Sequence, residues 1–529
     1  MDRYLTALGS RVVATHSPLS SKIALKIMED GGNVVDAAVT ASLVLSIAEP
    51  GWNGIGGGGF ALIYSEDIGL KALDYRETAP LSINIEDYQN EEEMSIGYKA
   101  VAVPGTLKGL WILHQEFGEY SWKKIIETVE KYTESTTVSM LWNKCMCNNL
   151  DNALCKLKLF HESSETFLRN GEIYPAGSTL SQHKLRLTIQ QLKEDIQYFY
   201  EGEFAGKLEE IFYMNDGYLS SRDLSNYKPV WREPIVTEVE LDGKNLKILG
   251  FPLPASSILV IHALKITPYL KLHEKDYYLK LSNLLIHLIR ERSYRICDPL
   301  FYNRDPLELL SERSIQEATE SIWTYSLKFL ANKDIANKDT GGTSHISIVD
   351  GSRKMCISLT ETIECFMGSG LTINGVLFND EMHDFTIEKN HPNSMYPGKR
   401  PASSMSPMII LNEDDIPEII IGASGGYRII SAITQVLLNY FIRKLDPVVS
   451  ILKGRIHVKE GKVIIEDNVR EEVLGSLLTS RLPISEVREV SMYPKTDLYF
   501  GAVQAVFKKN DKYIAVSDPR KQSGAYSEN

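Results

Sequence analysis

The spacing of hydrophobic residues along the chain changes at about residue 343. Before that point, apolar residues recur mainly at helical spacing, whereas after it they mostly alternate with polar residues. Near the N-terminus, residues 18–30 and 34–48 predict two helices; Ser17 is placed to cap the first, and Pro18 suits its first position. Further helices are expected within residues 105–235, 256–333 and 427–443, and strands within residues 236–250, 374–379, 407–412, 417–422 and 500–516.

The alternation is clearest just after residue 343, where it predicts a β-hairpin. Ile346 and Ile348 alternate with Ser347 and Val349, and Asp350-Gly351 marks a turn. If the loop runs from Asp350 to Arg353, Val349 pairs with Lys354 and Thr343 lies opposite Thr360. Thr362 is then a diagonal neighbour of Thr343, roughly 7–8 Å away and within side-chain reach. Glu364 continues the same face of the strand.

A run of glycines, Gly54-Ile55-Gly56-Gly57-Gly58-Gly59, resembles a dinucleotide-binding loop only superficially. It follows a predicted helix and precedes the predicted strand 60–64, which is the reverse of the strand-loop-helix order that such a site needs. The run is better explained as a turn where backbone segments approach closely.

Composition narrows the class of protein and its partners. The 529 residues carry 57 basic and 69 acidic side chains, a net charge of −12, and no basic stripe, so nucleic acid is not an expected partner. No apolar stretch is long enough to span a bilayer; Ile258 to Ile266 is short and contains His262, so no membrane association is expected. No apolar segment precedes Val12, which predicts the absence of a signal peptide and hence a cytoplasmic location.

The six cysteines are too sparse for a disulfide scaffold. Cys145, Cys147 and Cys155, with His161 beyond them, offer metal-binding side chains, but their spacing fits no standard zinc pattern. The segment is interpreted instead as an amphipathic helix, and no metal or cofactor is expected.

The segment Gly342-Thr343-Ser344-His345 carries the candidate chemistry. It follows a polar, glycine-bearing connector at residues 334–343, and seen alone it is a loop that leads into a strand. A threonine is a poor nucleophile unless a base takes its proton. Cleavage of the chain just before Thr343 would supply such a base, because the new α-amine, with a pKa of about 7.7–8.0, would lie beside the hydroxyl.

The wider sequence resembles the γ-glutamyltranspeptidase family of N-terminal-nucleophile hydrolases over nearly its whole length. The matching segments are 31–39, Glu49-Pro50, 54–60, 73–80, 103–105, 199–203, 231–234, 343–345, 379–382, Arg400-Pro401, 403–407, Gly425-Gly426 and Ser517-Asp518-Pro519-Arg520. The resemblance rests on the number of these segments and on their order along the chain.

The resemblance implies an α/β fold, a four-layer αββα sandwich made as one self-cleaving precursor. Cleavage between Gly342 and Thr343 would yield a large region, residues 1–342, and a small region, residues 343–529, that together form one domain. Thr343 would be the nucleophile, with its α-amine as base, and Thr362 matches the second threonine that hydrogen-bonds the nucleophile in the family. Backbone N–H groups of Gly425 and Gly426 would hold the oxyanion.

The implied substrate is a small γ-glutamyl donor such as glutathione, whose acyl group passes to water, an amino acid or a peptide. Arg76, Ser403 and Ser404 match the positions that bind the donor's α-carboxylate. Asp384, with Glu364 and Glu381 beside it, matches the site for its α-ammonium. The large and small regions of one precursor would stay together, and the sequence leaves open whether the protein also forms a homo-oligomer.

Two departures from the family pattern keep other functions open. His383 stands where many members have a second aspartate, and Ser424 replaces a proline common before the paired glycines. The alternatives are a related acylase or amidohydrolase that acts on other amides, and a processed but inactive relative that serves as a binding protein. A substrate without an amino-acid head would not use all of Arg76, Ser403, Ser404 and Asp384, which favours the γ-glutamyl donor over the acylase alternative.

Overall fold

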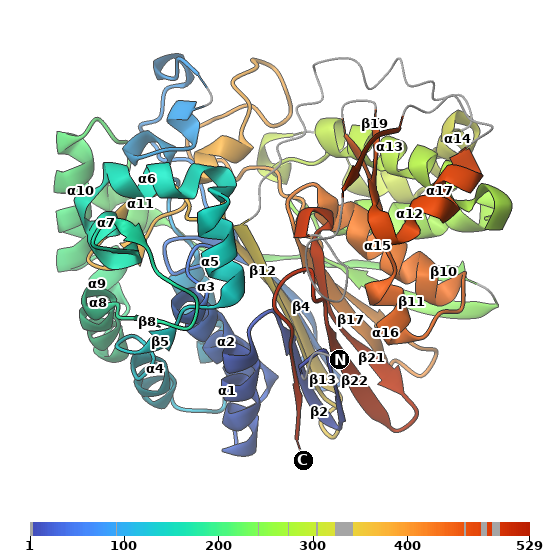
Figure 1. Ribbon diagram of the computed structural model, residues 1–529, viewed down its shortest axis with the longest axis horizontal. Helices are drawn as coiled ribbons and strands as arrows, with labels where there is room; N and C mark the ends of the chain where they lie inside the picture. Colours follow the sequence, from blue (N-terminus) through green and yellow to red (C-terminus); the bar gives the residue numbers. More distant parts are fainter. Residues whose placement is uncertain are drawn as a thin grey trace.

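A computed structural model describes residues 4–90, 92–241, 243–272, 274–302, 305–322, 342–459, 462–477, 484–488 and 498–528. Two seven-stranded antiparallel sheets pack face to face, and helices cover the outer side of each (Figure 1). This arrangement confirms the αββα sandwich expected from the sequence. None of the described helices is long and apolar enough to cross a membrane.

Each sheet is built from strands that come from both ends of the chain. The first sheet has the order β23 (Gly524–Ser527), β2 (Arg11–Thr15), β12 (Gly342–Asp350), β13 (Met355–Glu364), β3 (Gly58–Ser65), β4 (Gly69–Tyr75) and β9 (Val230–Arg232). The second has the order β1 (Thr6–Gly9), β22 (Lys512–Ser517), β21 (Ala502–Lys509), β17 (Pro417–Ser424), β16 (Met408–Leu411), β11 (Lys244–Gly250) and β10 (Ile235–Leu241). Both sheets therefore combine strands from before and after Gly342.

The helices divide between the two outer faces. The first sheet is covered by α1 (Pro18–Glu29), α2 (Val34–Ala48) and α3 (Thr106–Phe117), and the second by α12 (Ser257–Leu270) and α15 (Arg428–Phe441) (Figure 1). Helix α13 (Tyr277–Arg295) packs against α12. The other α-helices of the described residues are α4 (Trp122–Glu130), α5 (Met140–Cys147), α6 (Ala153–Leu159), α7 (His161–Phe167), α8 (His183–Glu194), α9 (Gln197–Tyr200), α10 (Glu203–Met214), α11 (Ser221–Asn226), α14 (Glu312–Ile322), α16 (Pro447–Leu452) and α17 (Arg470–Leu477). Short strands β5 (Thr136–Thr137), β6 (Leu168–Arg169), β7 (Glu172–Ile173), β8 (Thr179–Leu180), β14 (Thr372–Ile373), β15 (Val376–Leu377), β18 (Ile456–Lys459), β19 (Lys462–Glu466) and β20 (Ile484–Arg488) lie outside the two large sheets.

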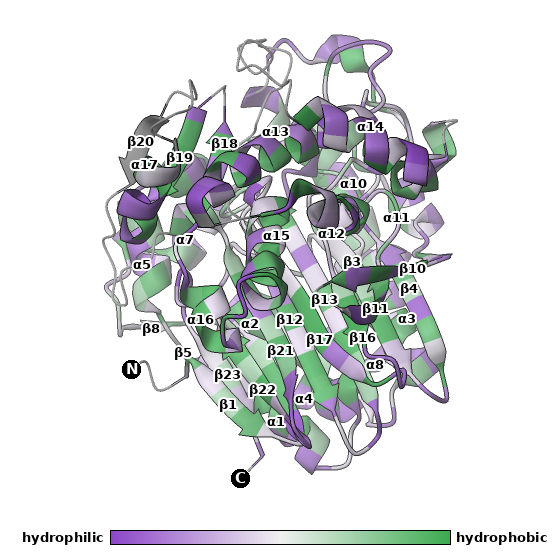
Figure 2. Ribbon diagram, turned by 90° about the vertical axis from the view of Figure 1, so that its right-hand side faces the viewer, coloured by the Kyte–Doolittle hydropathy of each residue, from purple (hydrophilic) through white to green (hydrophobic). Residues whose placement is uncertain are grey.

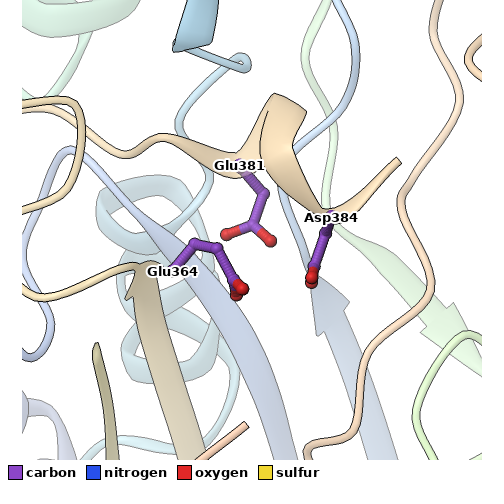
Figure 3. A group of neighbouring side chains, drawn as sticks. All are labelled: Glu364, Glu381 and Asp384. Atoms are coloured by element: carbon purple, nitrogen blue, oxygen red, sulfur yellow. The ribbon is translucent and has the colours of Figure 1, made fainter. Parts of the chain in front are cut away.

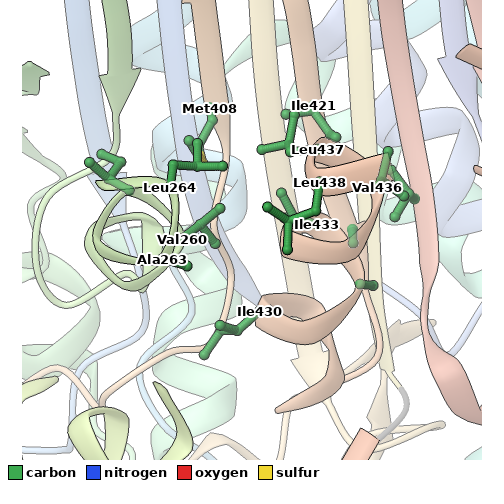
Figure 4. Close-up of a cluster of buried hydrophobic side chains, with 14 of the residues drawn as sticks. Val260, Ala263, Leu264, Met408, Ile421, Ile430, Ile433, Val436, Leu437 and Leu438 are labelled. Carbon is green, nitrogen blue, oxygen red and sulfur yellow. The ribbon is translucent and has the colours of Figure 1, made fainter. Parts of the chain in front are cut away.

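Both faces of the central strands are buried, so apolar side chains serve two cores (Figure 2). Phe60 and Leu62 of β3 join the core that includes the second sheet, whereas Ala61 and Ile63 join the core beneath α1 and α2. Figure 4 shows part of the first of these cores, where α12 and α15 place apolar side chains against the second sheet. Each large apolar side chain buried in this way stabilises the fold by about 1.5–3 kcal/mol.

The two N-terminal helices begin where the sequence predicts. The Ser17 hydroxyl accepts a hydrogen bond from the N–H of Ser20, and α1 starts at Pro18. Asn33 and Asp36 form a reciprocal capping box at the start of α2. The predicted helix 427–443 is also confirmed, as α15.

The predicted register of the 343–364 hairpin was wrong by two residues. Asp350 pairs with Met355, so the loop runs from Gly351 to Lys354, and Thr343 lies directly opposite Thr362 rather than Thr360. The loop keeps the predicted length but is displaced by one residue, and Lys354 takes the left-handed conformation with φ of 47°. A one-residue displacement of the loop moves every cross-strand partner by two, which leaves Thr343 and Thr362 on the predicted face.

The cysteine-bearing segment differs from the single amphipathic helix that the sequence predicted. It forms α5, α6 and α7. Residues 148–152, among which Asn149, Asp151 and Asn152 have positive φ, separate α5 from α6, and Phe160 separates α6 from α7. Cys145 packs in a hydrophobic cluster, whereas Cys147 and Cys155 are exposed.

The glycine run at 54–59 forms the expected close-packed turn and continues into β3, whose first two residues are Gly58 and Gly59. A Cβ at Gly59 would lie 2.4 Å from the carbonyl oxygen of Thr360. Of the predicted connector, residues 334–341 lie outside the described residues, while Gly342 and Thr343 already belong to β12.

Candidate active site

A small pocket lies beside the N-terminal end of β12, and most of the predicted site residues line it. Its wall consists of Thr343, Thr362, Glu364, Asp384, Ser403, Ser404, Met405, Gly426, Tyr427 and Ile429. Seven of these ten were predicted from the sequence. The cavity volume is about 10 Å³, which is about enough for one water molecule.

The hairpin brings the candidate nucleophile and the predicted cleavage site together. Thr343 lies opposite Thr362, and the Thr362 hydroxyl donates a hydrogen bond of 2.5 Å to the carbonyl oxygen of Gly342. The same hydroxyl accepts the N–H of Glu364 at 2.8 Å. The ladder is irregular here, because Thr343 pairs with Thr362 but Gly342 pairs with Glu364. The carbonyl that precedes Thr343 is therefore polarised by a fixed hydroxyl.

Gly342 is the residue type that this irregular ladder accommodates. A Cβ at position 342 would lie 2.6 Å from the carbonyl oxygens of both Glu364 and Cys365. Both atoms belong to the backbone and cannot rotate away. A side chain at this position would force the peptide bond between residues 342 and 343 to move.

Three carboxylates gather on one side of the pocket (Figure 3). Glu364 ends β13 with φ of 70°, and Glu381 and Asp384 come from a short 3₁₀ helix, η9 (Glu381–Asp384). Their oxygens lie within 4.8 Å of one another, close enough to hold a cation. The guanidinium of Arg76 supplies a positive charge here: it contacts Glu381 and lies 2.5 Å from Asp384. Arg76 also lies 3.5 Å from Glu77 and is fully buried.

The buried carboxylates differ in their affinity for protons. Burial raises the pKa of Glu364 and of Glu381 well above the ordinary value, and raises that of Glu77 to about 7. For Asp384, burial is outweighed by the charges of Arg76 and Arg292, which lower its pKa. Of the three carboxyl groups that face one another, Asp384 is therefore the one whose environment favours the ionised form.

Ser403 and Ser404 also line the pocket and are held by the backbone around them. The Ser403 hydroxyl accepts the N–H of Met405 at 3.1 Å, and the carbonyl of Ser403 accepts the Ser256 hydroxyl at 2.6 Å. Among the described residues, no contact joins Arg76 to either serine, so Arg76 stands apart from the serine pair.

The predicted oxyanion loop lies between β17 and α15. Gly425 and Gly426 both have positive φ, 126° and 58°, a conformation that disfavours other residue types. Among the described residues, neither N–H group donates a hydrogen bond to another group. Both N–H groups therefore stay available at the start of a helix, where negative charge is stabilised.

Three residues at the site were missed from the sequence. Lys521 donates a hydrogen bond to the carbonyl oxygen of Thr343, and Arg292 donates one to the hydroxyl of Ser404. Tyr427 lines the pocket and stacks on Arg292. Lys521 directly follows the matched segment that ends at Arg520, so the family resemblance could have pointed to it. Arg292 lies in a helix outside the matched segments, and nothing in its local sequence indicates a role at the site.

Comparison with known proteins places the chain in a family. The sequence model described as gamma-glutamyltranspeptidase matches residues 20–527. The chain belongs to this family. Glutathione hydrolase 2 of Arabidopsis thaliana is 30% identical over 96% of this chain and 92% of its own, and the glutathione hydrolase proenzyme of Bacillus subtilis is 29% identical over the same shares. This γ-glutamyltranspeptidase is therefore an enzyme with the γ-glutamyl hydrolase and transferase activity of its family.

A solved structure supports the fold of this γ-glutamyltranspeptidase independently. The crystal structure of cephalosporin acylase from Bacillus halodurans superimposes with a TM-score of 0.86 over all of this chain and 98% of its own. The two sequences are 21% identical, so this likeness concerns the fold alone.

Proposed function

We propose that this chain is a γ-glutamyl hydrolase and transferase that cleaves the γ-glutamyl amide of glutathione or related compounds through an acyl-Thr343 intermediate. It would first cleave itself between Gly342 and Thr343. The proposal is carried by the hydrogen bond from the Thr362 hydroxyl to the Gly342 carbonyl, directly beside Thr343. The matched relatives named glutathione hydrolase proenzymes support the same activity.

Self-cleavage begins with attack of the Thr343 hydroxyl on the carbonyl carbon of Gly342. The Thr362 hydroxyl stabilises the oxygen as it becomes negative, and the C–N bond between residues 342 and 343 breaks. The resulting ester joins Gly342 to the Thr343 side chain and leaves the α-amine of Thr343 free. Water then hydrolyses the ester, which restores the hydroxyl and leaves Gly342 as a carboxylate.

Cleavage also supplies space for a donor. In the unbroken chain the cavity is about 10 Å³, too small for a glutamyl group. Once Gly342 ends in a free carboxylate, it is no longer held in β12 by a peptide bond to Thr343. Its departure opens the region in front of Thr362.

Turnover uses the same hydroxyl on the γ-carbonyl carbon of the donor. The Thr343 α-amine takes the hydroxyl proton and passes it to the leaving amine as the amide bond breaks. The N–H groups of Gly425 and Gly426 hold the oxyanion. Water or an acceptor amine then attacks the acyl-threonine ester, releasing glutamate or a new γ-glutamyl amide.

The charged walls of the pocket suit the amino-acid head of the donor. Its α-ammonium would be received by Asp384, with Glu364 and Glu381 beside it. Its α-carboxylate would lie against the hydroxyls of Ser403 and Ser404, with Arg76 near by. A substrate without this head would not use all of these groups.

The test is a denaturing gel followed by a γ-glutamyl-p-nitroanilide assay with and without glycylglycine. Two fragments and release of p-nitroaniline that glycylglycine accelerates would support the transferase. Turnover unaffected by glycylglycine would indicate a hydrolase. Fragments without turnover would indicate an inactive relative, and activity only on amides without a glutamyl head would indicate an acylase. The Thr343→Ala variant should give one uncut, inactive chain.

A further inference from the structure

Helix α13 places a second arginine at the serine wall of the pocket. Arg292 Nε donates a hydrogen bond of 3.0 Å to the Ser404 hydroxyl, and Nη2 donates one of 3.3 Å to the carbonyl of Ala402. The guanidinium carbon lies 4.3 Å from the ring centroid of Tyr427, which lines the pocket. Arg292 is 4% exposed. Two hydrogen bonds and an aromatic ring thus fix a buried cation beside Ser404.

Arg292 differs from Arg76 in how its charge is balanced. Arg76 contacts the three carboxylates of Glu77, Glu381 and Asp384. Within the described part of the chain, no carboxylate lies within ion-pair distance of Arg292, and Nη1 makes no hydrogen bond. A buried cation without a partner carboxylate is unfavourable unless an anion binds there.

The charge of Arg292 acts on the pocket. Burial favours the neutral form of Asp384, which also lines the pocket, but the charges of Arg76 and, to a smaller extent, Arg292 lower its pKa. The pocket thus has a carboxylate side, where Arg76 is already neutralised, and a serine side that carries an unneutralised guanidinium. A ligand that bears both an ammonium and a carboxylate matches this separation of charge.

We propose that Arg292 is a specificity-determining residue that binds the α-carboxylate of the γ-glutamyl donor together with Ser403 and Ser404. The proposal rests on the proposed function. Arg76, whose charge is already balanced by the carboxylates that it contacts, would add to the binding of the α-carboxylate less strongly than Arg292. Tyr427 would keep the guanidinium plane in place, because its ring stacks on Arg292.

The experiment compares two donors that differ in the α-carboxylate alone: γ-glutamyl-p-nitroanilide and 4-aminobutyryl-p-nitroanilide. In Arg292→Gln, we expect kcat/KM for the first donor to fall about 10- to 100-fold, the loss expected for one charged hydrogen-bond partner. The second donor should change by less than about threefold, because it has no carboxylate to lose. Arg292→Lys should lie between wild type and Arg292→Gln on the first donor.

Arg295→Gln is the matched control, since Arg295 lies on the same helix and pairs with Glu291 and Glu308 outside the pocket. It should leave both donors unchanged. If the shortened donor turns over too slowly, glutamate and 4-aminobutyrate replace the two donors as competitive inhibitors of γ-glutamyl-p-nitroanilide, and Arg292→Gln should weaken glutamate alone.

Rates are expressed per mole of self-cleaved enzyme. An equal loss on both ligands, or failure of both Arg292 variants to self-cleave, would overturn the proposal, because either would make Arg292 a structural residue. No loss on either ligand would overturn it too, because Arg292 would then not bind the donor. Wild-type enzyme that self-cleaves but ignores γ-glutamyl-p-nitroanilide would instead contradict the proposed function.

Discussion

The side-chain nitrogen of Lys521 lies 2.5 Å from the carbonyl oxygen of Thr343, to which it donates a hydrogen bond. Lys521 is buried, and its nitrogen lies 3.7 Å from the ring centroid of Trp52. Burial lowers its pKa to about 7, although Cys145 and Glu49 act in the opposite direction. The charge of Lys521 also adds to the effect of burial in lowering the pKa of His16. A titratable cation thus lies next to the backbone of the proposed nucleophile.

Replacing Lys521 by Met should raise the pH at which activity appears. The proposed base is the α-amine of Thr343, whose ordinary pKa is about 7.7–8.0. A neighbouring positive charge disfavours the ammonium form and so lowers that pKa. Without Lys521 the amine should hold its proton to higher pH, and the acid limb of the kcat/KM profile should move upward. The profile is measured on self-cleaved enzyme with γ-glutamyl-p-nitroanilide.

Lys521→Arg is the control for this pH profile, because it keeps a positive charge at the same position. Its acid limb should stay closer to that of wild type. A downward or absent shift in Lys521→Met would restrict Lys521 to a structural role.

Thr362→Ala should slow self-cleavage by about 10²–10³-fold, the loss seen when one oxyanion donor is removed. The reason is that the Thr362 hydroxyl donates to the Gly342 carbonyl, which becomes an oxyanion when Thr343 attacks. A time course of fragment formation on denaturing gels measures the rate. Thr362→Ser keeps the hydroxyl and should retain most of it. Equal rates for Thr362→Ala and wild type would remove Thr362 from the reaction.

Gly342→Ala should also slow or abolish self-cleavage, for a steric reason. The new Cβ would lie 2.6 Å from two backbone carbonyl oxygens, so the bond to be cleaved must shift away from Thr362. Gly206→Ala is a suitable control, because a Cβ there meets nothing within 4 Å. Normal cleavage of Gly342→Ala would mean that the carbonyl need not be held where the structure places it.

The sequence located the faces of the central hairpin but not its pairing. Alternation determines which side chains share a face, and it correctly placed Thr343 and Thr362 together. It does not determine where a four-residue loop begins, because Asp350 and Lys354 can each serve as a strand end or a loop residue. The exact partner of Thr343 therefore had to come from the structure.

The charged residues around the pocket were harder to predict. Lys521 is 178 residues from Thr343 in sequence, and Arg292 is 112 residues from Ser404. A buried lysine or arginine has the same local sequence pattern as an exposed one, so tertiary contacts alone reveal it. The carboxylate group was found through family resemblance, yet its neutralisation by Arg76 was not.

Replacing Arg76 by Met should destabilise the fold, and more so at higher pH. Removing one partner of a buried ion pair costs about 3–5 kcal/mol. In the native state the pKa of Glu77 is already raised to about 7 by burial. Between its unfolded value and pH 7 the folded chain therefore binds more protons than the unfolded one, and stability falls as pH rises.

Loss of the Arg76 charge raises the pKa of Glu77 further and extends this window upward. Thermal unfolding of Arg76→Met and wild type at about pH 5 and pH 8 measures the effect, and the difference in Tm should be larger at pH 8. A difference that is equal at both pH values, or larger at pH 5, would mean that the carboxylates do not depend on Arg76 for their ionisation.

The most direct test of acyl transfer through Thr343 is mass spectrometry of enzyme quenched during turnover of a slow γ-glutamyl donor. The predicted result is two fragments, one beginning at Thr343, which gains the mass of one glutamyl group on the side chain of that residue. The adduct should disappear when the donor is exhausted and be absent from Thr343→Ala. A glutamyl adduct on any other residue, or sustained turnover by a chain that remains uncut at Gly342, would contradict the assignment of Thr343 as nucleophile.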